Sequence, residues 1–515
     1  ATKYEIQTSL NGQEFTTVKE CTATEAGSQT YRDLQVDAAR YVRIYCQEPK
    51  TAKYGYSIYE LEVFAQNSMG SAKDILDSLN GQKPEISDDG THLVLPEVPD
   101  GYRISLYGSD NQQVVKLDGT IIQPLVDMDV NLLYKVENME DAEDVAKSEA
   151  DIKITVPGKY ETENRDNEKP NVLPGLREWK GGEGTYTRTE DSRLVVSDDS
   201  MSSAADVIKT YFDDMLDIDI EIVKGEEPKA GDVYLKTGGT VDELGEEGYL
   251  LEIGDYVTIT SPTVTGMTYG GASVTQILYQ DEDMDNIAKG TARDYPKYPI
   301  RAGMVDVGRM YIPLEYLKEM TIYMSWFKMN EIQVHINDYW SQSGYSAFRL
   351  ESDTYPEIVA DDGYYTKDDY RQYQKDMKKY GIDVITEIDT PYHAECFRDV
   401  PGVKMLDGKK GYLDITTDEA REANQEIIEN LIDEYLDGED PVVQSKNFHI
   451  GTDEYDKNYG EQMRKWTDHF INYVNDKGYQ TRLWGSLGKN GFNGTTPVSN
   501  EAVMNMWAPY WADVH

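Results

Sequence analysis

The sequence Phe448-His-Ile-Gly-Thr-Asp453-Glu454 decides the predicted fold. It begins as a short apolar strand and ends in two adjacent carboxylates. Helical patterns lie on both sides of it, over residues 426–436 and 461–473. A strand between two helices indicates a parallel sheet with helical crossovers. In such folds the chemistry lies at the carboxyl ends of the strands, which makes the two acids candidate functional residues.

The alternation of side chains along this strand sets a geometric condition for the acid pair. His449, Gly451 and Asp453 share one face of a regular strand. Glu454 can join Asp453 in the same cleft only if the strand already breaks into a loop at that point. In so acidic a chain, a solvated loop pair is the alternative interpretation.

The composition limits the kind of partner. The 515 residues carry 95 acidic and 50 basic side chains, for a net charge of −45. This charge argues against nucleic acid or an anionic membrane as a partner and favours a neutral or cationic ligand. The three cysteines have no metal-ligand spacing and form no disulfide framework. No run of 18 apolar residues exists, so the sequence predicts no transmembrane span.

Three domains are predicted before the motif. Residues 1–66 alternate in strands around an Asn11-Gly12 turn and read as a β-sandwich. Residues 67–167 contain further short strands and read as an immunoglobulin-like spacer. Residues 168–297 mix helical and strand patterns and read as a small α+β domain, with no residues that look catalytic.

Residues 298–515 alternate strand and helix, and we interpret them as a (β/α)8 barrel. About six strand–helix units are present and a closed barrel needs eight, so we expect the barrel to be incomplete in this sequence. The predicted strands are 303–307, 331–336, 382–388, 448–450, 480–484 and 502–507. An open doubly wound sheet is the alternative, but no Gly-rich phosphate loop follows any strand.

Polar and aromatic residues follow successive predicted strands at their carboxyl ends. In strand order they are Asp306 and Arg309; His335, Asn337, Asp338 and Trp340; Glu387, Asp389, His393 and Glu395; Asp453 and Glu454; Trp484; and Trp507. Any one of these alone is weak evidence, because a single His or Trp is commonly a core residue. Carboxylates, an Arg and Trp side chains on one rim suit a sugar, whose rings stack on aromatic faces and whose hydroxyls bridge to charged groups.

The motifs along these strands resemble glycoside hydrolase family 20, the β-N-acetylhexosaminidases and lacto-N-biosidases. The matching motifs are Arg301-x-Gly-Met-Val-Asp306-Val-x-Arg309, Lys328-Met-Asn330, His335-x-x-Asp338, Glu387-x-Asp389-Thr-Pro-x-His393 and His449-x-Gly-x-Asp453-Glu454. The resemblance covers residues 171–515, since an α+β domain before the barrel is usual in that family.

This resemblance implies a retaining, substrate-assisted mechanism without metal or cofactor. The 2-acetamido oxygen of the substrate attacks the anomeric carbon. Glu454 is then expected to protonate the leaving oxygen as general acid and later to activate water, which calls for a raised pKa. Asp453 is expected to hold the acetamido N–H and to stabilise the cation.

The same resemblance assigns substrate contacts to five further residues. Arg309 is expected to bind the C3 and C4 hydroxyls. His393 and Asp338 are expected to form a polar network near the acid, and Trp484 and Trp507 to wall the acetamido pocket. The implied partner is an oligosaccharide or glycoconjugate.

Three departures from the family pattern bear on the substrate. Thr452 stands for the usual second Gly of Gly-Gly-Asp-Glu, Tyr392 for the Gly of Asp-Thr-Pro-Gly-His, and Asn-Asp-Tyr-Trp over 337–340 for Asp-Asp-Gln-Gly-Trp. Together with the additional β-domains they favour the lacto-N-biosidase-like branch, which releases a disaccharide. The exo-β-N-acetylhexosaminidases are the alternative within the family.

The first domain resembles the C-terminal half of a discoidin-like domain. Its matching strands begin at Tyr4, Arg40 and Tyr56, and the first strands of that family are absent. Together with the resemblance to glycosidases, this domain predicts a secreted or cell-surface protein, from a bacterium.

Two hypotheses of other classes remain at the sequence level. One is a carbohydrate-binding or adhesion protein with an inactive barrel, suggested by the β-domains and the missing last strands. The other is a metal-dependent hydrolase with His335, Asp338, His393 and Asp453 as ligands; the family resemblance supplies a metal-free role instead.

Overall fold

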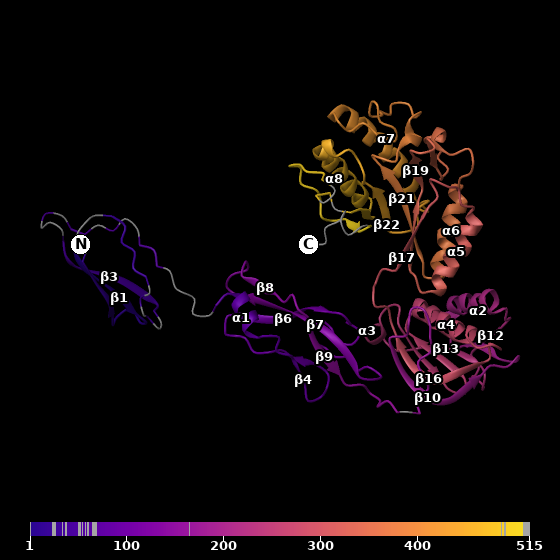
Figure 1. The fold of residues 1–515 in the computed structure, drawn as a ribbon, viewed down its shortest axis with the longest axis horizontal. Coiled ribbons are helices and arrows are strands. Elements are labelled where there is room, and N and C mark those ends of the chain that lie inside the picture. Colours follow the sequence, from indigo (N-terminus) through magenta and orange to yellow (C-terminus); the bar gives the residue numbers. More distant parts are fainter. Residues whose placement is uncertain are drawn as a thin grey trace. The chain divides into compact units, whose positions relative to one another are not determined.

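The computed structural model describes residues 2–507 except 23–26, 33, 35, 37–38, 50–52, 54, 57, 59–60, 64–69, 164, 486 and 489–490. The chain divides into two compact units, Ala1–Gly70 and Ser71–His515 (Figure 1). Among the described residues, no helix is both long and apolar enough to cross a membrane.

The first unit contains an antiparallel sheet in the order β2-β1-β3. Its strands are β1 Lys3–Ser9, β2 Thr16–Thr22 and β3 Tyr41–Glu48. The predicted Asn11-Gly12 turn follows β1, with Gly12 at a φ of 74°. The strand predicted over 59–64 falls in part on residues outside the described ones, so the discoidin-like assignment stays a prediction.

Residues 71–156 form a four-stranded antiparallel sheet in which β7 pairs with β6, β8 and β9. The elements are α1 Ala72–Ser78, β4 Glu85–Ile86, β5 Leu93–Val94, β6 Tyr102–Ser109, β7 Met128–Asn138, β8 Val145–Lys147 and β9 Ile152–Val156. Helix α1 begins at a Ser71 capping box and buries Ala72 and Ile75 against the sheet. This helix is missing from the immunoglobulin-like prediction, which expected only strands.

The α+β domain is a seven-stranded mixed sheet in the order β10-β16-β14-β15-β13-β11-β12. Its elements are β10 Glu178–Thr187, β11 Arg193–Val196, α2 Ser202–Leu216, β12 Glu221–Lys224, β13 Val233–Thr237, α3 Val241–Leu244, β14 Tyr249–Ile253, β15 Val257–Ser261, α4 Val264–Tyr279 and β16 Asn286–Asp294. Helices α2 and α4 lie side by side (Figure 1). They touch closely because Gly271 has no side chain: a Cβ there would lie 2.2 Å from Ile208 Cγ1.

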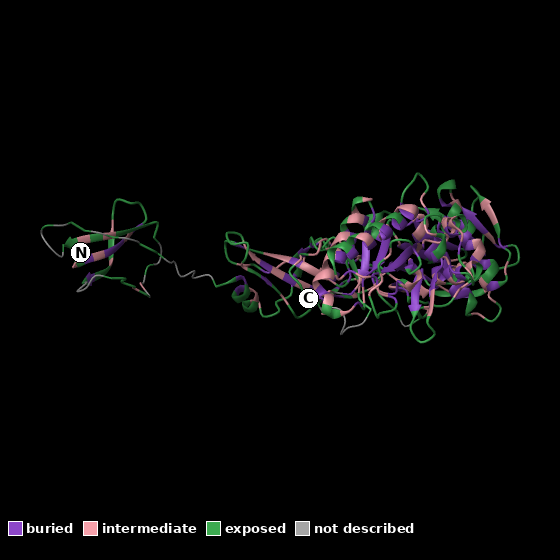
Figure 2. Cartoon of the chain, turned by 90° about the horizontal axis from the view of Figure 1, so that it is seen from above, coloured by how far each residue is buried: buried purple, intermediate pink, exposed green. Residues whose placement is uncertain are grey.

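The C-terminal part is a parallel sheet in the order β17-β18-β21-β22-β23-β24. Its strands are β17 Ala302–Asp306, β18 Glu331–His335, β21 Asp383–Thr390, β22 Asn447–Gly451, β23 Gln480–Trp484 and β24 Val503–Asn505. The helices are α5 Leu314–Trp326, α6 Lys367–Lys379, α7 Asp418–Leu436 and α8 Gly460–Asp476. The six predicted strands are therefore present in sequence order, and their neighbours in the sheet are their neighbours in the chain. The inner strands β18, β21 and β22 are almost wholly buried, whereas the edge strands β17 and β24 are not; Figure 2 colours buried residues purple.

Two local predictions in this region need correction. The second strand was expected to run to residue 336, but it ends at His335 and a hairpin follows, β19 Asn337–Trp340 with β20 Tyr345–Phe348. The pattern Thr416-x-x-Glu419 predicts a capping box that begins α7 at Thr416. The cap is Thr417, whose side chain accepts from the Ala420 N–H, because the Thr416 hydroxyl donates to Asp414 at 2.6 Å instead.

A buried charge pair joins the α+β domain to the parallel sheet. Lys328 follows α5, is only 6% exposed and has a φ of 57°. Its Nζ donates to Asp294 Oδ2 at 2.8 Å and to the Tyr249 hydroxyl at 3.0 Å. A buried charge needs such partners, so the Lys-Met-Asn motif has a structural role at this junction.

We predict that Lys328→Met lowers the free energy of unfolding by about 3–5 kcal/mol, because it leaves the Asp294 carboxylate buried without its cation. Chemical denaturation of the full chain measures this. Lys379→Met is the matched control, since Lys379 forms an exposed pair with Asp376, and its cost should stay below about 0.5 kcal/mol. Equal costs for the two variants would contradict the prediction.

Candidate active site

The acid pair lies just beyond the end of β22. The strand ends at Gly451, and positive φ angles at Gly451 (70°), Thr452 (73°) and Glu454 (49°) turn the chain sharply. The side chain of Asp453 is 13% exposed and that of Glu454 is 47% exposed. The strand therefore breaks where both acids can share one cleft, as the sequence required.

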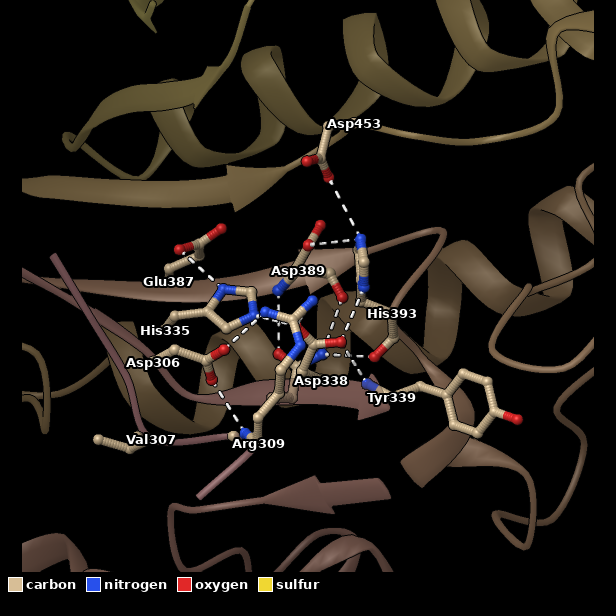
Figure 3. A network of polar contacts seen from close by, with 12 residues as sticks. Asp306, Val307, Arg309, His335, Asp338, Tyr339, Glu387, Asp389, His393 and Asp453 are labelled. Carbon is tan, nitrogen blue, oxygen red and sulfur yellow. Dashed lines mark hydrogen bonds and ion pairs between the residues drawn. The ribbon is translucent and has the colours of Figure 1, made fainter. Parts of the chain in front are cut away.

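Asp338 is the centre of a buried polar network (Figure 3). Its side chain is 1% exposed. Oδ2 lies 2.7 Å from Arg309 Nη2 and 2.9 Å from His335 Nε2, and Oδ1 lies 2.8 Å from His393 Nδ1. Arg309 also pairs with Asp306 at 2.6 Å. Burial opposes ionisation, but the hydrogen bonds to His335 and His393 outweigh it and lower the pKa of Asp338.

Glu387 lies beneath this network on β21 and is fully buried. Its Oε2 lies 2.9 Å from His335 Nδ1 and accepts from Gln333 Nε2 at 2.7 Å. Its Oε1 accepts from the Trp484 indole N–H at 2.6 Å and lies 3.4 Å from His449 Nδ1. Burial would raise the pKa of Glu387, yet the charges of His335 and His449 lower it to about 2. His335 is thus held between two ionised carboxylates.

His449 behaves differently from the other two histidines. Burial lowers its pKa to about 4, with Glu387 acting in the opposite direction. For His335 and His393, burial also favours the neutral form, but the facing carboxylates raise the pKa well above the usual value. At neutral pH, His335 and His393 are therefore cations and His449 is not.

Asp389 and Asp453 form a second, crowded set of carboxyls around His393. His393 Nε2 lies 3.9 Å from an oxygen of each. Asp389 Oδ1 and Asp453 Oδ1 are buried and have no hydrogen-bond partner among the described residues. Burial raises the pKa of Asp453 to about 6, against the charge of His393. Burial and the Asp453 charge raise that of Asp389 well above its usual value.

The pKa of Glu454 differs from the sequence expectation. A raised value was expected, but the hydrogen bond from His393 lowers the pKa of Glu454, with burial acting the other way. His393 Nε2 lies 3.3 Å from Glu454 Oε2. The side chain is too exposed for burial to dominate. In this state the proton of the pair is on the imidazole and Glu454 is ionised.

The two predicted tryptophans have different settings. Trp484 ends β23, and its ring lies 4.8 Å from the His449 ring. Its indole N–H also donates to Glu387, so Trp484 is part of the polar network. Trp507 follows β24 by two residues and is 41% exposed.

Several groups of donors lie close enough to hold a cation. Within the described residues, Asp306, His335 and Asp338 form one such group, and Asp389, His393 and Asp453 another. In the first group, the Arg309 guanidinium already pairs with both carboxylates. That fixed cation supplies the charge that a metal would bring.

Glu387 and Asp389 were noted at a strand end, but their function in the network was not predicted. Both are inward residues of β21, spaced two apart, so they lie on one face of the strand. The alternation of side chains along β21 is the sequence signal that places Glu387 and Asp389 on the face shared with His335 and Asp453.

Comparisons with known proteins identify the family of this chain. Residues 298–510 match the family model for the glycosyl hydrolase family 20 catalytic domain, and residues 169–295 match that for domain 2 of the same family. The chain belongs to glycosyl hydrolase family 20 and carries both of these domains.

Two curated relatives show how much of a longer protein the chain spans. It is 28% identical to a lacto-N-biosidase of Bifidobacterium bifidum over 371 residues, covering 66% of this chain and 31% of that protein. It is 23% identical to a β-hexosaminidase of Porphyromonas gingivalis over 317 residues, covering 56% and 39%. The chain therefore spans about a third of the length of these relatives.

Solved structures support the fold. A family 20 β-N-acetylhexosaminidase from Streptomyces coelicolor matches with a TM-score of 0.54 and 20% identity, over 66% of this chain and 70% of that chain. An exo-β-N-acetylglucosaminidase from Vibrio harveyi matches with a TM-score of 0.53 and 15% identity, over 72% and 63%. The six-stranded sheet is thus part of the TIM-barrel fold of this family.

We predict that Gly451→Ala displaces the Asp389 carboxylate. A Cβ at position 451 would lie 1.8 Å from Asp389 Oδ1, and the φ of 70° is unfavourable for any side chain. Gly408→Ala is the matched control, because Gly408 has the same φ of 70° and nothing within 4 Å of its Cβ position.

Thermal unfolding should show a larger loss for Gly451→Ala, by about 1–3 kcal/mol beyond the control. The difference isolates the steric clash from the backbone strain. The same melting temperature for both variants would show that Asp389 moves at no cost.

Proposed function

We propose that the full-length protein is a retaining, substrate-assisted glycoside hydrolase that releases N-acetylhexosamine-containing sugars from glycans. The observation that carries this proposal is the division of the acid pair. Asp453 is mostly buried beside Asp389 and His393, whereas Glu454 is half exposed and contacts the same imidazole. A shielded acid and an exposed acid at one strand end suit two separate tasks.

The substrate contacts follow from the exposure and charge of the groups. Arg309, 41% exposed, presents its guanidinium to solvent while Asp306 and Asp338 hold it in place. It is suited to bind two neighbouring sugar hydroxyls. Asp453 Oδ1 accepts no hydrogen bond from the residues that the structure describes, so it is available to an acetamido N–H. The substrate's own acetamido oxygen then attacks the anomeric carbon.

Proton transfer is assigned to Glu454 and His393 together. In the described state the imidazolium holds the proton and Glu454 is ionised. A bound sugar would exclude water from Glu454 and favour its neutral form, because a carboxylate loses more than a carboxylic acid on desolvation. Glu454 can then donate to the leaving oxygen and, as the carboxylate, later accept a proton from the attacking water.

Disaccharide release is the finer proposal. It is supported by the lacto-N-biosidase among the relatives and by the departures at Thr452, Tyr392 and residues 337–340. Release of a single N-acetylhexosamine is the alternative within the family. Export to the cell surface and a discoidin-like appendage are further parts of the proposal, supported by the acidic composition and the strand motifs of residues 1–66.

We predict that the full-length protein cleaves lacto-N-tetraose and that Glu454→Gln lowers the rate by orders of magnitude, because the amide cannot protonate the leaving oxygen. Chromatography of the products measures both the rate and the sugar released. Galactosyl-N-acetylglucosamine supports the lacto-N-biosidase-like activity, and a single N-acetylhexosamine supports the alternative. Glu422→Gln, an exposed change on α7, should act as wild type.

Near-normal turnover by Glu454→Gln would exclude Glu454 as the acid. Glycan binding by the wild-type protein without turnover of any N-acetylhexosaminide would favour the other class considered from the sequence, a carbohydrate-binding protein with an inactive barrel.

We predict that kcat/KM falls as the pH falls through about 6. The pKa of Asp453 is about 6, so Asp453 is ionised above this pH and protonated below it. Only the carboxylate can stabilise the developing cation.

Asp453→Asn removes the titrating group. We expect kcat/KM of this variant to be much lower than that of wild type and to show no fall near pH 6. Asp376→Asn on α6, a partly exposed acid that pairs with Lys379, serves as control and should keep this acid limb of the pH profile. An unchanged midpoint in Asp453→Asn would assign the limb to another group. Initial rates at low substrate concentration over pH 4–9 measure it.

A further inference from the structure

Tyr392 departs from the family pattern, and in the structure its ring contacts two other rings near the acid pair. The centroid of the Tyr392 ring lies 4.1 Å from that of the His393 ring and 4.1 Å from that of the Tyr412 ring. The two tyrosines are stacked with an interplanar angle of 30°. Both are partly exposed. The stacked tyrosine pair is thus joined to the His393 imidazole, which contacts Glu454 and is tilted by 42° to the Tyr392 ring.

The outer ring of the stack also reaches the acid turn from the other side. Tyr412 makes an edge contact with Tyr455, the residue after Glu454, at 5.2 Å. Tyr455 is buried, and its hydroxyl donates to the Leu413 carbonyl at 2.6 Å. Tyr412 is therefore tied to both neighbours of the general acid: to His393 through Tyr392, and to Tyr455 directly.

The loop that carries Tyr412 is built for this close approach. Gly411 has a φ of 79°, and a Cβ there would lie 3.0 Å from the Tyr339 ring and 3.2 Å from the Tyr392 ring. Lys409 Nζ lies 3.4 Å from Asp456 Oδ2, which joins the loop to the acid turn again. Residues 409–412 are thus held against residues 453–456 by several contacts.

The tyrosine hydroxyls remain hydrogen-bond donors. Burial, followed by the neighbouring Tyr412 and the Glu454 carboxylate, raises the pKa of Tyr392. Burial raises that of Tyr412, with Glu454 adding to it and Lys409 acting against it. The charge of Glu454 acts on both hydroxyls, and the ring contacts join Tyr392 to His393 and Tyr412 to Tyr455, so the tyrosine pair lies near the general acid.

We propose that Tyr392 and Tyr412 form the wall of a subsite for the leaving-group sugar, the part of the glycan that Glu454 protonates. This proposal rests on the proposed function, because it takes the exposed side of Glu454 as the side on which the leaving oxygen lies. Two neutral hydroxyls on a rigid aromatic stack suit a neutral hexose, whose hydroxyls can accept from them while its C–H groups contact the ring edges.

The test compares two substrates that release the same sugar. Lacto-N-tetraose has lactose as its leaving group, and the β-fluoride of the same released sugar has no leaving-group ring. In the double variant Tyr392→Phe/Tyr412→Phe the stack is kept and only the hydroxyls are lost. The ratio of kcat/KM for the tetrasaccharide to that for the fluoride should fall about tenfold relative to wild type, as two lost hydrogen bonds imply.

Tyr323→Phe is the matched control, since Tyr323 is a 45% exposed tyrosine on α5, and it should leave the ratio unchanged. The double Ala variant removes the rings as well and should lower the ratio further, with folding checked by thermal unfolding. An unchanged ratio in both double variants would overturn the proposal. An equal loss on both substrates would also overturn it, because the tyrosines would then act on Glu454 through His393.

A binding measurement distinguishes a failure of this proposal from a failure of the proposed function. If the wild-type full-length protein hydrolyses neither substrate, the proposed function fails. Titration with lactose, followed by NMR, still tests whether Tyr392 and Tyr412 bind the leaving-group sugar. Weakening of lactose binding at least threefold by the double Phe variant supports the subsite. Lactose binding that is absent, or that is equal in both proteins, overturns it.

Discussion

The described site depends on one buried carboxylate. Asp338 receives hydrogen bonds or ion pairs from Arg309, His335 and His393, which come from three different parts of the sheet. A carboxylate this deeply buried is stable only with such partners. In return it fixes the orientation of the guanidinium that faces solvent and of the imidazole that contacts Glu454. Both ends of the proposed sugar site are thus positioned by the same side chain.

An imbalance of charge then gives the acids of the site different pKa values. Around Asp338 there are more buried or half-buried carboxyls than cations to pair with them. Asp338, Glu387 and Glu454 have the close imidazole contacts, and their pKa values are lowered. Asp389 and Asp453 share one imidazole at 3.9 Å, and their pKa values are raised. Asp453 and Glu454 are adjacent in the chain, but their pKa values move in opposite directions because burial dominates at Asp453 and the hydrogen bond from His393 dominates at Glu454.

Much of the fold could be predicted from the sequence because its signals are local. The strand–helix alternation after residue 298 located six strands, and the Asp-Glu pair after an apolar strand located the rim of the sheet. Helix α1 was missed because it is short, and the bounds of α4 are hard to predict because Gly266, Gly270 and Gly271 resemble a loop. In α4 these glycines allow close packing, and only the neighbouring helix and sheet reveal that reason.

The sequence by itself determined which residue types stand at each strand end, and with them the family and the candidate acids. Only the tertiary structure decided that Glu454 is ionised while Asp453 titrates near pH 6, that Trp484 is bonded to Glu387, and that Tyr392 and Tyr412 stack beside the acid turn. Strand patterns arise from local alternation and can be read in one dimension. The pKa of a group and the partner of a ring depend on distances between residues that are far apart in the chain, and those are set only when the strands align.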